Sequence, residues 1–237
     1  MSRTILVTGA SNGIGYQTAL QLAVENNIVI ALARNKNKLE ALCNEALEQN
    51  GAAKIYPLPF DLSSQDYKSL SNELHQLNIT KIDCLINNAG LLINKPFEQL
   101  QLEDFKQVYQ VNVFAPAMLI QTLLPLLKQS NDAHIINISS MGGVGGTSKF
   151  AGLSAYSSSK GALLTLSECL ATEFAPLNIK VNCLALGGVN TEMLAGAFPG
   201  YEAPLSATKM AEWISWFALN GQQFFNGKVI PVAVSNP

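Results

Sequence analysis

A tyrosine and a lysine stand four residues apart in the segment Tyr156-Ser-Ser-Ser-Lys160. In a helix this spacing places both side chains on one face, one turn apart. A phenol has a pKa of about 10, and a nearby cation favours the phenolate and lowers that pKa. Such a tyrosine can exchange a proton with an alcohol or a carbonyl near neutral pH. The same spacing also arises by chance on helix surfaces, so position in the fold must decide between the two interpretations.

Three glycines near the amino terminus form a second candidate site. The segment from Thr8 to Gly15 follows a short apolar run, and its glycines have the spacing G-x-x-x-G-x-G. Glycines at such a turn allow close approach to a pyrophosphate, and a helix N-terminus presents N–H groups to an anion. We expect a dinucleotide-binding loop with contacts from Gly9, Ser11, Asn12, Gly13, Ile14 and Gly15. A glycine-rich turn without a ligand is the alternative. The lysine of a P-loop is missing, so phosphoryl transfer is not supported.

The residue after the second apolar run predicts which dinucleotide binds. An acidic side chain there hydrogen-bonds the ribose 2′-hydroxyl of NAD, whereas an arginine accommodates the 2′-phosphate of NADP. The chain has Arg34 at this position, and the next acidic residue is Glu40. A planar guanidinium suits a phosphate. The sequence therefore predicts NADP(H) in preference to NAD(H), with an ordinary surface arginine as the alternative.

Apolar runs and helical patterns alternate along the chain, and these elements must position the candidate residues. Short apolar runs indicate strands at 4–8, 28–33, 53–58, 82–87, 134–138, 179–184 and 228–232. Helical patterns cover 14–25, 36–49, 64–77, 103–128, 155–175 and 207–219. Pro116 and Pro125 should bend or break the long helix. The alternation predicts a doubly wound α/β fold, a parallel sheet of about seven strands with helices on both faces. We expect a single domain over residues 1–237.

Ligands of such sheets bind outside the carboxyl ends of the strands, and polar residues follow several of the predicted strands. Asp61-Leu62 comes after the third strand, Asn87–Gly90 after the fourth and Ser139-Ser140 after the fifth. Asn112 lies between two valines in the long helix, an unusual place for an amide. A hydroxyl after the fifth strand could hold a substrate oxygen beside Tyr156.

Composition excludes several classes of protein. Hydrophobic residues make up 48% of the chain and charged residues 14%, which is typical of a globular protein. A net charge of −2 gives no support for binding nucleic acid or an anionic membrane. The four cysteines and two histidines lack metal-ligand spacing, so we expect no metal, and we expect both histidines on a helix surface or a strand edge. We find no signal-peptide pattern and no apolar run of membrane-spanning length, and we expect a cytoplasmic protein.

Taken together in chain order, these motifs resemble the short-chain dehydrogenase/reductase family. The resemblance covers nearly the whole chain and rests on the segments that begin at Thr8, Asp61, Asn87, Val111, Ile138 and Tyr156. It implies a Rossmann-type fold and an enzyme, an oxidoreductase that transfers hydride between NADP(H) and a carbonyl compound or secondary alcohol. We expect reduction of a small or hydrophobic ketone or aldehyde. The alternatives are alcohol oxidation, non-redox chemistry on the same fold, and a catalytically silent NADPH-binding regulator.

The resemblance also implies roles for individual residues. Tyr156 is expected to act as the general acid in reduction, and Lys160 to hold the nicotinamide ribose and lower the pKa of the tyrosine. Ser140 would orient the substrate carbonyl, with Ser139 left open as the alternative. Asn112 would support a water-mediated proton relay behind Lys160. The remaining expected cofactor contacts are Asp61, Leu62, Asn88, Ala89, Gly90, Val189 and Thr191.

Two departures from the family pattern concern the substrate side. Ser140 lies further ahead of Tyr156 than is usual in the family, and the usual Pro-Gly after the sixth strand is Leu186-Gly187 here. The residues expected to line the substrate site are Leu91, Leu92, Met141, Phe150, Leu153, Met193, Leu194, Phe198 and Tyr201. The resemblance further implies a homodimer or homotetramer formed through the helices at 103–128 and 155–175.

Overall fold

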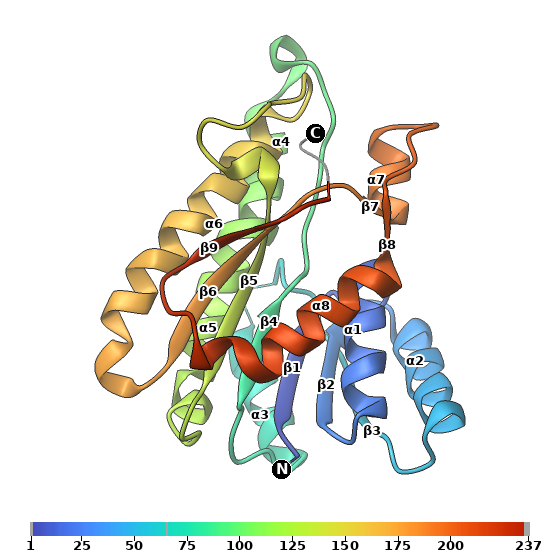
Figure 1. The fold of residues 1–237 in the computed structure, drawn as a ribbon, viewed down its shortest axis with the longest axis vertical. Helices are drawn as coiled ribbons and strands as arrows, with labels where there is room; N and C mark the ends of the chain where they lie inside the picture. Colours follow the sequence, from blue (N-terminus) through green and yellow to red (C-terminus); the bar gives the residue numbers. More distant parts are fainter. Residues whose placement is uncertain (1, 65, 235–237) are drawn as a thin grey trace.

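The computed structural model describes residues 2–64 and 66–234. Within these residues, seven parallel strands form one sheet in the order β3-β2-β1-β4-β5-β6-β9 (Figure 1). The strands of this sheet are β1 (Thr4–Thr8), β2 (Ile28–Ala33), β3 (Lys54–Pro59), β4 (Cys84–Asn87), β5 (His134–Ser140), β6 (Lys180–Leu186) and β9 (Val229–Val232). A separate pair consists of β7 (Val189–Asn190) and β8 (Leu205–Ser206). The predicted doubly wound parallel sheet is confirmed.

The strand order reverses at β1, in the middle of the sheet. The chain first builds outward through β2 and β3 and then returns to add β4 on the other side of β1, so that Val7 pairs with both Ala31 and Ile86. Parallel crossovers bring every strand back in the same direction. The carboxyl ends of β1, β4, β5 and β6 therefore meet at one edge, and the loops that follow them lie side by side there.

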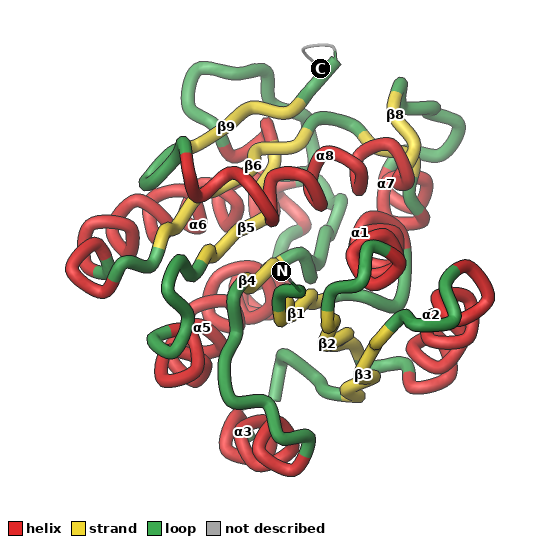
Figure 2. The backbone as a smooth tube through the Cα atoms, turned by 60° about the horizontal axis from the view of Figure 1, so that its bottom comes forward, coloured by secondary structure: helices red, strands yellow, loops and turns green. Residues whose placement is uncertain are grey.

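Two helical layers cover the sheet (Figure 2). One face carries α1 (Gly13–Val24), α2 (Lys36–Gln49) and α8 (Ala207–Asn220). The other face carries α3 (Tyr67–Gln76), α5 (Ala115–Leu127) and α6 (Ser154–Glu173). The shorter helical segments are η1 (Phe97–Gln99), α4 (Leu102–Tyr109), η3 (Met141–Gly143), η4 (Ala175–Leu177), α7 (Glu192–Ala197) and η5 (Gly221–Gln223). Each layer is held by leucines such as Leu39 and Leu123, which have no exposed surface and stabilise the fold by about 2 kcal/mol each.

The long helical region does not break at its prolines. Helical structure continues from Leu102 to Leu127, and a π-helical turn, η2 (Gln110–Phe114), joins α4 to α5. Pro116 stands in the first turn of α5 directly after this wide turn. Because proline has no N–H, it leaves one carbonyl of the π turn without a helical donor. An expected break at Pro116 or Pro125 is therefore wrong, whereas an expected bend stays a prediction; the irregularity in the helical turn precedes the first proline.

The same region, Leu102–Leu127, is long and apolar enough to cross a membrane by length and composition, contrary to the expectation that no apolar run has that length. Its most apolar 18-residue window has a mean hydropathy of 1.4, and 39% of that window is buried. Leu119, Ile120 and Leu123 of α5 belong to the core beneath the sheet. These apolar residues thus serve as one side of a core helix.

Three further details differ from the predicted boundaries. Helix α3 begins at Tyr67 and not at residue 64, because the Asp66 carboxylate caps it by accepting a hydrogen bond of 3.1 Å from the Ser69 amide. Residue 65 lies outside the described residues. Strand β5 extends to Ser140, so both serines belong to the strand and not to the loop after it. The short elements α7, β7 and β8 were not predicted, because such lengths show no periodicity.

The histidine at the start of β5 is in the core and not at a strand edge. His134 has no exposed surface, and its ring lies on Phe217 of α8, with ring centroids 5.2 Å apart. Asn182 accepts from the Lys228 amide through Oδ1, so its Nδ2 faces His134 Nε2 at 3.1 Å, and this ring nitrogen must accept. Burial lowers the pKa of His134 to about 3. The folded protein therefore holds this histidine neutral.

We expect the free energy of unfolding to fall as the pH drops below about 6.5, because the unfolded chain then binds a proton at His134 that the folded chain does not bind until about pH 3. One such group costs up to about 1.4 kcal/mol per pH unit. His134→Gln should remove this part of the pH dependence in denaturant titrations between pH 6.5 and 5. His75→Gln, at the exposed histidine of α3, is the control and should keep it. An unchanged pH slope in His134→Gln would contradict the buried neutral state.

Candidate functional site

A cavity of about 700 Å³ opens at the carboxyl edge of the sheet, between the glycine loop, the ends of β4, β5 and β6, and α7. Most of the residues predicted from the sequence line it. They are Gly9, Ser11, Asn12, Gly13, Ile14, Arg34, Asp61, Leu62, Asn88, Ala89, Gly90, Ser140, Tyr156, Lys160, Val189 and Thr191. Gly15 and Asn112 are buried and do not line it.

The glycine loop has the backbone that a phosphate site requires. Gly9 and Gly13 have φ angles of 68° and 54°, which glycine adopts without strain. A β-carbon on Gly15 would lie 2.4 Å from the Gly9 carbonyl oxygen, so only glycine fits beneath the loop. Asn12 is the N-cap residue of α1, yet its side chain makes no capping hydrogen bond. The first N–H groups of α1 are thus available to an anion, and the loop fits the pyrophosphate of a dinucleotide.

Thr8 joins the glycine loop to the segment after β4, a role that was not assigned to it from the sequence. Its Oγ1 accepts hydrogen bonds from the amides of Asn88 and Ala89, both at 3.0 Å. Asn88 Nδ2 donates to the Thr8 carbonyl at 2.9 Å. The usable signal in the sequence was a threonine at the end of an apolar run, directly before Gly9.

Arg34 and Asp61 line the cavity at the ends of β2 and β3. The amide and hydroxyl of Ser63 donate to the Asp61 carboxylate at 2.9 and 2.8 Å. The amide hydrogen bond is the main cause of the lowered pKa of Asp61, and the charge of Arg34 lowers it further. Arg34 itself is exposed, so its guanidinium can reach a ligand phosphate. This end of the cavity is the one suited to an adenosine ribose.

Tyr156 and Lys160 lie in the first two turns of α6 and both line the cavity, as their spacing predicts. Lys160 Nζ is 5.8 Å from the centroid of the Tyr156 ring and donates to the Ile138 carbonyl at 2.7 Å. Only 3% of the Lys160 surface is exposed. Ser140, at the end of β5, lies close enough to Tyr156 to lower its pKa. A phenol, an amine and a hydroxyl group therefore meet at one wall of the cavity.

The two serines at the end of β5 have different partners. The Ser139 hydroxyl donates to the Lys160 carbonyl at 2.9 Å, and this residue is nearly fully buried. The Ser140 hydroxyl accepts from the Gly142 amide at 3.1 Å and is partly exposed. Ser139 thus joins β5 to α6, whereas Ser140 is the serine whose hydroxyl meets Tyr156.

The electrostatics of the Tyr156–Lys160 pair differ from the expectation. Burial raises the pKa of Tyr156 to about 12, and the Ser140 hydroxyl opposes this only in part. Burial lowers the pKa of Lys160 to about 8. Because the pKa of Lys160 lies below that of Tyr156, the lysine is already neutral at the pH at which the tyrosine ionises, and its charge is not among the causes of the tyrosine shift. Desolvation is the dominant effect on both groups.

Asn112 lies in the π turn and connects two walls of the site. Its Oδ1 accepts from the Leu91 amide at 2.8 Å, and its Nδ2 donates to the Leu91 carbonyl and to the Ser159 hydroxyl, both at 2.9 Å. A β-carbon on Gly90 would lie 3.5 Å from both Asn112 Oδ1 and Lys160 Nζ, so both groups lie against the loop after β4. These three hydrogen bonds position the loop after β4 against α6.

The nine apolar residues predicted for the substrate side all line the cavity. Phe150 meets Phe198 of the segment after α7 edge to face, with ring centroids 5.9 Å apart. Asn94 Nδ2 donates to the Ala197 carbonyl at 2.7 Å and so ties the loop after β4 to α7. The lengthened loop before Tyr156 is closed by the Thr147 hydroxyl, which lies 2.7 Å from the Met141 carbonyl. These segments together form an apolar wall.

The loop after β6 reaches the glycine loop despite its changed sequence. Thr191 caps α7 by accepting from the Leu194 amide at 3.2 Å. A β-carbon on Gly13 would lie 3.3 Å from Thr191 Cγ2, so the two loops touch. Val189 is held by its pairing with Leu205 in the β7–β8 pair.

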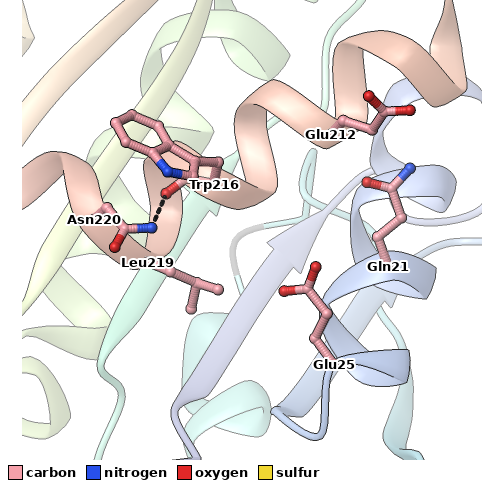
Figure 3. Close-up of a pocket in the computed structure, with 6 residues that line it drawn as sticks. All are labelled: Gln21, Glu25, Glu212, Trp216, Leu219 and Asn220. Carbon is pink, nitrogen blue, oxygen red and sulfur yellow. Dashed lines mark hydrogen bonds between the residues drawn. The ribbon is translucent and has the colours of Figure 1, made fainter.

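A second hollow, of about 470 Å³, lies between α1 and α8 (Figure 3). Its walls are formed by Gln21, Glu25, Glu212, Trp216, Leu219 and Asn220. None of the predicted site residues belongs to it. Within the described part of the chain, no cluster of three or more His, Cys, Asp and Glu side chains could hold a metal ion.

Known proteins share this sequence pattern and this structure. The family model described as short chain dehydrogenase matches residues 3–202. A fatty acyl-CoA reductase of Mycobacterium tuberculosis is 35% identical over 216 residues, which cover 90% of this chain and 72% of that protein.

Two similar crystal structures are those of a short-chain dehydrogenase from Shigella flexneri complexed with NADP and one from Escherichia coli complexed with NADPH. Each has a TM-score of 0.87 and 31% identity, and the matches cover 97% of this chain and 96% and 95% of those chains. The family model covers most of the chain, and both structures share the seven-stranded Rossmann-type sheet. The chain therefore belongs to the short-chain dehydrogenase/reductase family and is an oxidoreductase.

Proposed function

We propose that this protein is an NADP(H)-dependent reductase of a small or hydrophobic ketone or aldehyde. The observation that carries the proposal is the meeting of Tyr156, Lys160 and Ser140 in one cavity with the glycine loop and Arg34. The relatives complexed with NADP and NADPH support the choice of cofactor. The apolar wall favours a hydrophobic carbonyl compound, in keeping with a fatty acyl-CoA reductase among the relatives.

In the proposed reaction the bound nicotinamide supplies a hydride to the carbonyl carbon. Tyr156 donates a proton to the carbonyl oxygen, and the Ser140 hydroxyl holds that oxygen. Lys160 binds the cofactor ribose next to the tyrosine. A pKa of about 12 keeps Tyr156 protonated at neutral pH, which suits a proton donor in reduction.

The proton that Tyr156 loses must be replaced from solvent. Lys160, whose pKa is about 8, can pass a proton on near neutral pH. The side chain of Asn112 already makes three hydrogen bonds, so we assign its part in the relay to its backbone carbonyl, which lies in the π turn before Pro116. A water held by that carbonyl would lie behind Lys160.

We also propose a homodimer or homotetramer formed through α4–α5 and α6. Phe114 and Met118 of this region are 50% and 40% exposed, and an interface would bury them. Residues 1–237 would act as one domain, because both helical layers are built on one sheet. All four cysteines are free, which accords with a reducing cytoplasm.

Tyr156→Phe should lower turnover by about 10³-fold, because it removes the proposed proton donor and leaves the cavity shape unchanged. NADPH consumption with a panel of ketones, aldehydes, quinones and keto-acyl thioesters is the measurement. NADPH binding, followed by fluorescence, should stay within about twofold. Retained activity would place the chemistry elsewhere, and a wild-type enzyme that reduces none of the panel would favour the NADPH-binding regulator.

Lys160→Met should stabilise the cofactor-free protein at pH 7 while it abolishes turnover. The pKa of Lys160 falls from 10.5 to about 8 on folding. Below pH 8 the buried ammonium therefore destabilises the folded protein by its full amount, up to about 3 kcal/mol. The gain should shrink as the pH rises from 8 towards 10.5, where the lysine is neutral in both states. Thermal unfolding at pH 7 and 9.5 measures this gain in stability, with Lys128→Met, at an exposed lysine, as the control. If Lys160→Met is less stable than the wild type at both pH values, the buried charge does not destabilise the fold.

Arg34→Ala should weaken NADPH binding at least tenfold and leave NADH binding nearly unchanged, because NADH has no 2′-phosphate. Titration of both cofactors by calorimetry is the measurement. The wild-type protein should bind NADPH more tightly than NADH. A clear preference for NADH would overturn the cofactor assignment.

A further inference from the structure

Lys38 reaches from the first turn of α2 to the glycine loop. Its Nζ donates to Asn12 Oδ1 at 2.5 Å. Its backbone amide donates to the Asn35 side chain, the N-cap of α2, at 3.1 Å. The cap fixes where the lysine leaves the helix, and the side chain then crosses to a loop 26 residues earlier in the sequence.

The contact also explains the behaviour of Asn12. An asparagine at an N-cap normally accepts from an amide of its own helix, but Asn12 makes no such bond. Its side-chain oxygen is directed to Lys38 instead. The result is an uncapped helix start and an ammonium beside it, both at the end of the cavity that Asn12 and Arg34 line.

Lys36 provides a contrast within the same turn of α2. Its Nζ lies 3.7 Å from Glu40 Oε1, an ion pair along the helix. Among the salt bridges of residues 2–64 and 66–234, none involves Lys38, whose contact is a neutral amide oxygen. The charge of Lys36 is thus balanced by a carboxylate, whereas that of Lys38 is left for an anion.

We propose that Lys38 binds the 2′-phosphate of NADP(H) from the side opposite Arg34, and that Asn12 holds its ammonium at this site before the phosphate arrives. The inference rests on the proposed use of NADP(H). In this fold the 2′-substituent of the adenosine ribose binds at the end of β2, which here is the position between Arg34 and the glycine loop. Lys38 Nζ stands on the glycine-loop side of that position. A flexible ammonium complements the planar guanidinium of Arg34, because it needs only a side-chain rotation to follow the phosphate.

Lys38→Met and its matched control Lys36→Met test the inference, since both remove one charge from the same helical turn. Calorimetric titrations would use NADPH, NADH, 2′,5′-ADP and 5′-AMP, so that binding is measured without turnover. Lys38→Met should weaken NADPH and 2′,5′-ADP about tenfold and leave NADH and 5′-AMP within about twofold. Lys36→Met should leave all four within about twofold, and Lys38→Arg should restore most of the NADPH affinity.

Three outcomes would overturn the inference. Equal weakening of NADPH and NADH by Lys38→Met would mean that the lysine shapes the glycine loop and does not read the phosphate. Equal effects of Lys38→Met and Lys36→Met would mean that both lysines act only through long-range attraction of the cofactor's negative charge, without a contact from Lys38 to the 2′-phosphate. A wild-type preference for NADPH that depends on Arg34 but is unaffected by Lys38→Met would overturn this inference alone, whereas a wild-type preference for NADH would overturn the cofactor proposal itself.

Discussion

Lys160 carries its charge in a place that water hardly reaches, and the surrounding elements are arranged to hold it. Its ammonium donates to the Ile138 carbonyl, and Ser139 donates to the Lys160 carbonyl, so β5 and α6 are joined in both directions. A β-carbon on Gly143 would lie 2.7 Å from the Lys160 carbonyl carbon, so the turn after β5 can approach α6 only as glycine. This close approach brings Ser140 to Tyr156. Burial of a cation destabilises the folded state. The apolar cores between the sheet and its two helical layers must therefore provide the compensating stability.

The two ends of the cavity differ in chemistry for a reason that lies in the topology. At one end the order of strands reverses, Thr8 joins β1 to the segment after β4, and an uncapped helix faces the cations of Arg34 and Lys38. At the other end the loops after β4, β5 and β6 bring apolar side chains together. A charged cofactor anchored at the first end leaves its reactive end beside Tyr156, next to the apolar wall. In the proposed reaction, the charged end of the cavity therefore orients the cofactor, and the apolar wall orients the substrate.

Long elements were predictable because their signal is continuous along the chain. β1, β2 and α2 have the predicted boundaries, since an apolar run or a long amphipathic pattern specifies each of them. The π turn at Asn112 was not predictable, because a proline signals a missing N–H but not how a helix adapts to it. His134 was expected at a strand edge, yet α8, far away in the sequence, covers its ring. Lys38 carried no signal of its own, because its partner Asn12 belongs to another element.

By itself the sequence determined most of the strands, the doubly wound fold class, and the residue types that a dinucleotide and a proton transfer require, because each appears as a pattern within short segments. The order of the strands, with its reversal at β1, was decided by pairing between distant segments. The tertiary structure decided which of these groups are buried and what they contact. Whether Ser139 or Ser140 meets Tyr156, and whether desolvation or the lysine controls the pKa of that tyrosine, depends on how closely α6 approaches β5. Burial and hydrogen bonding between distant segments are properties of the assembled fold, so spacing along the chain contains no measure of them.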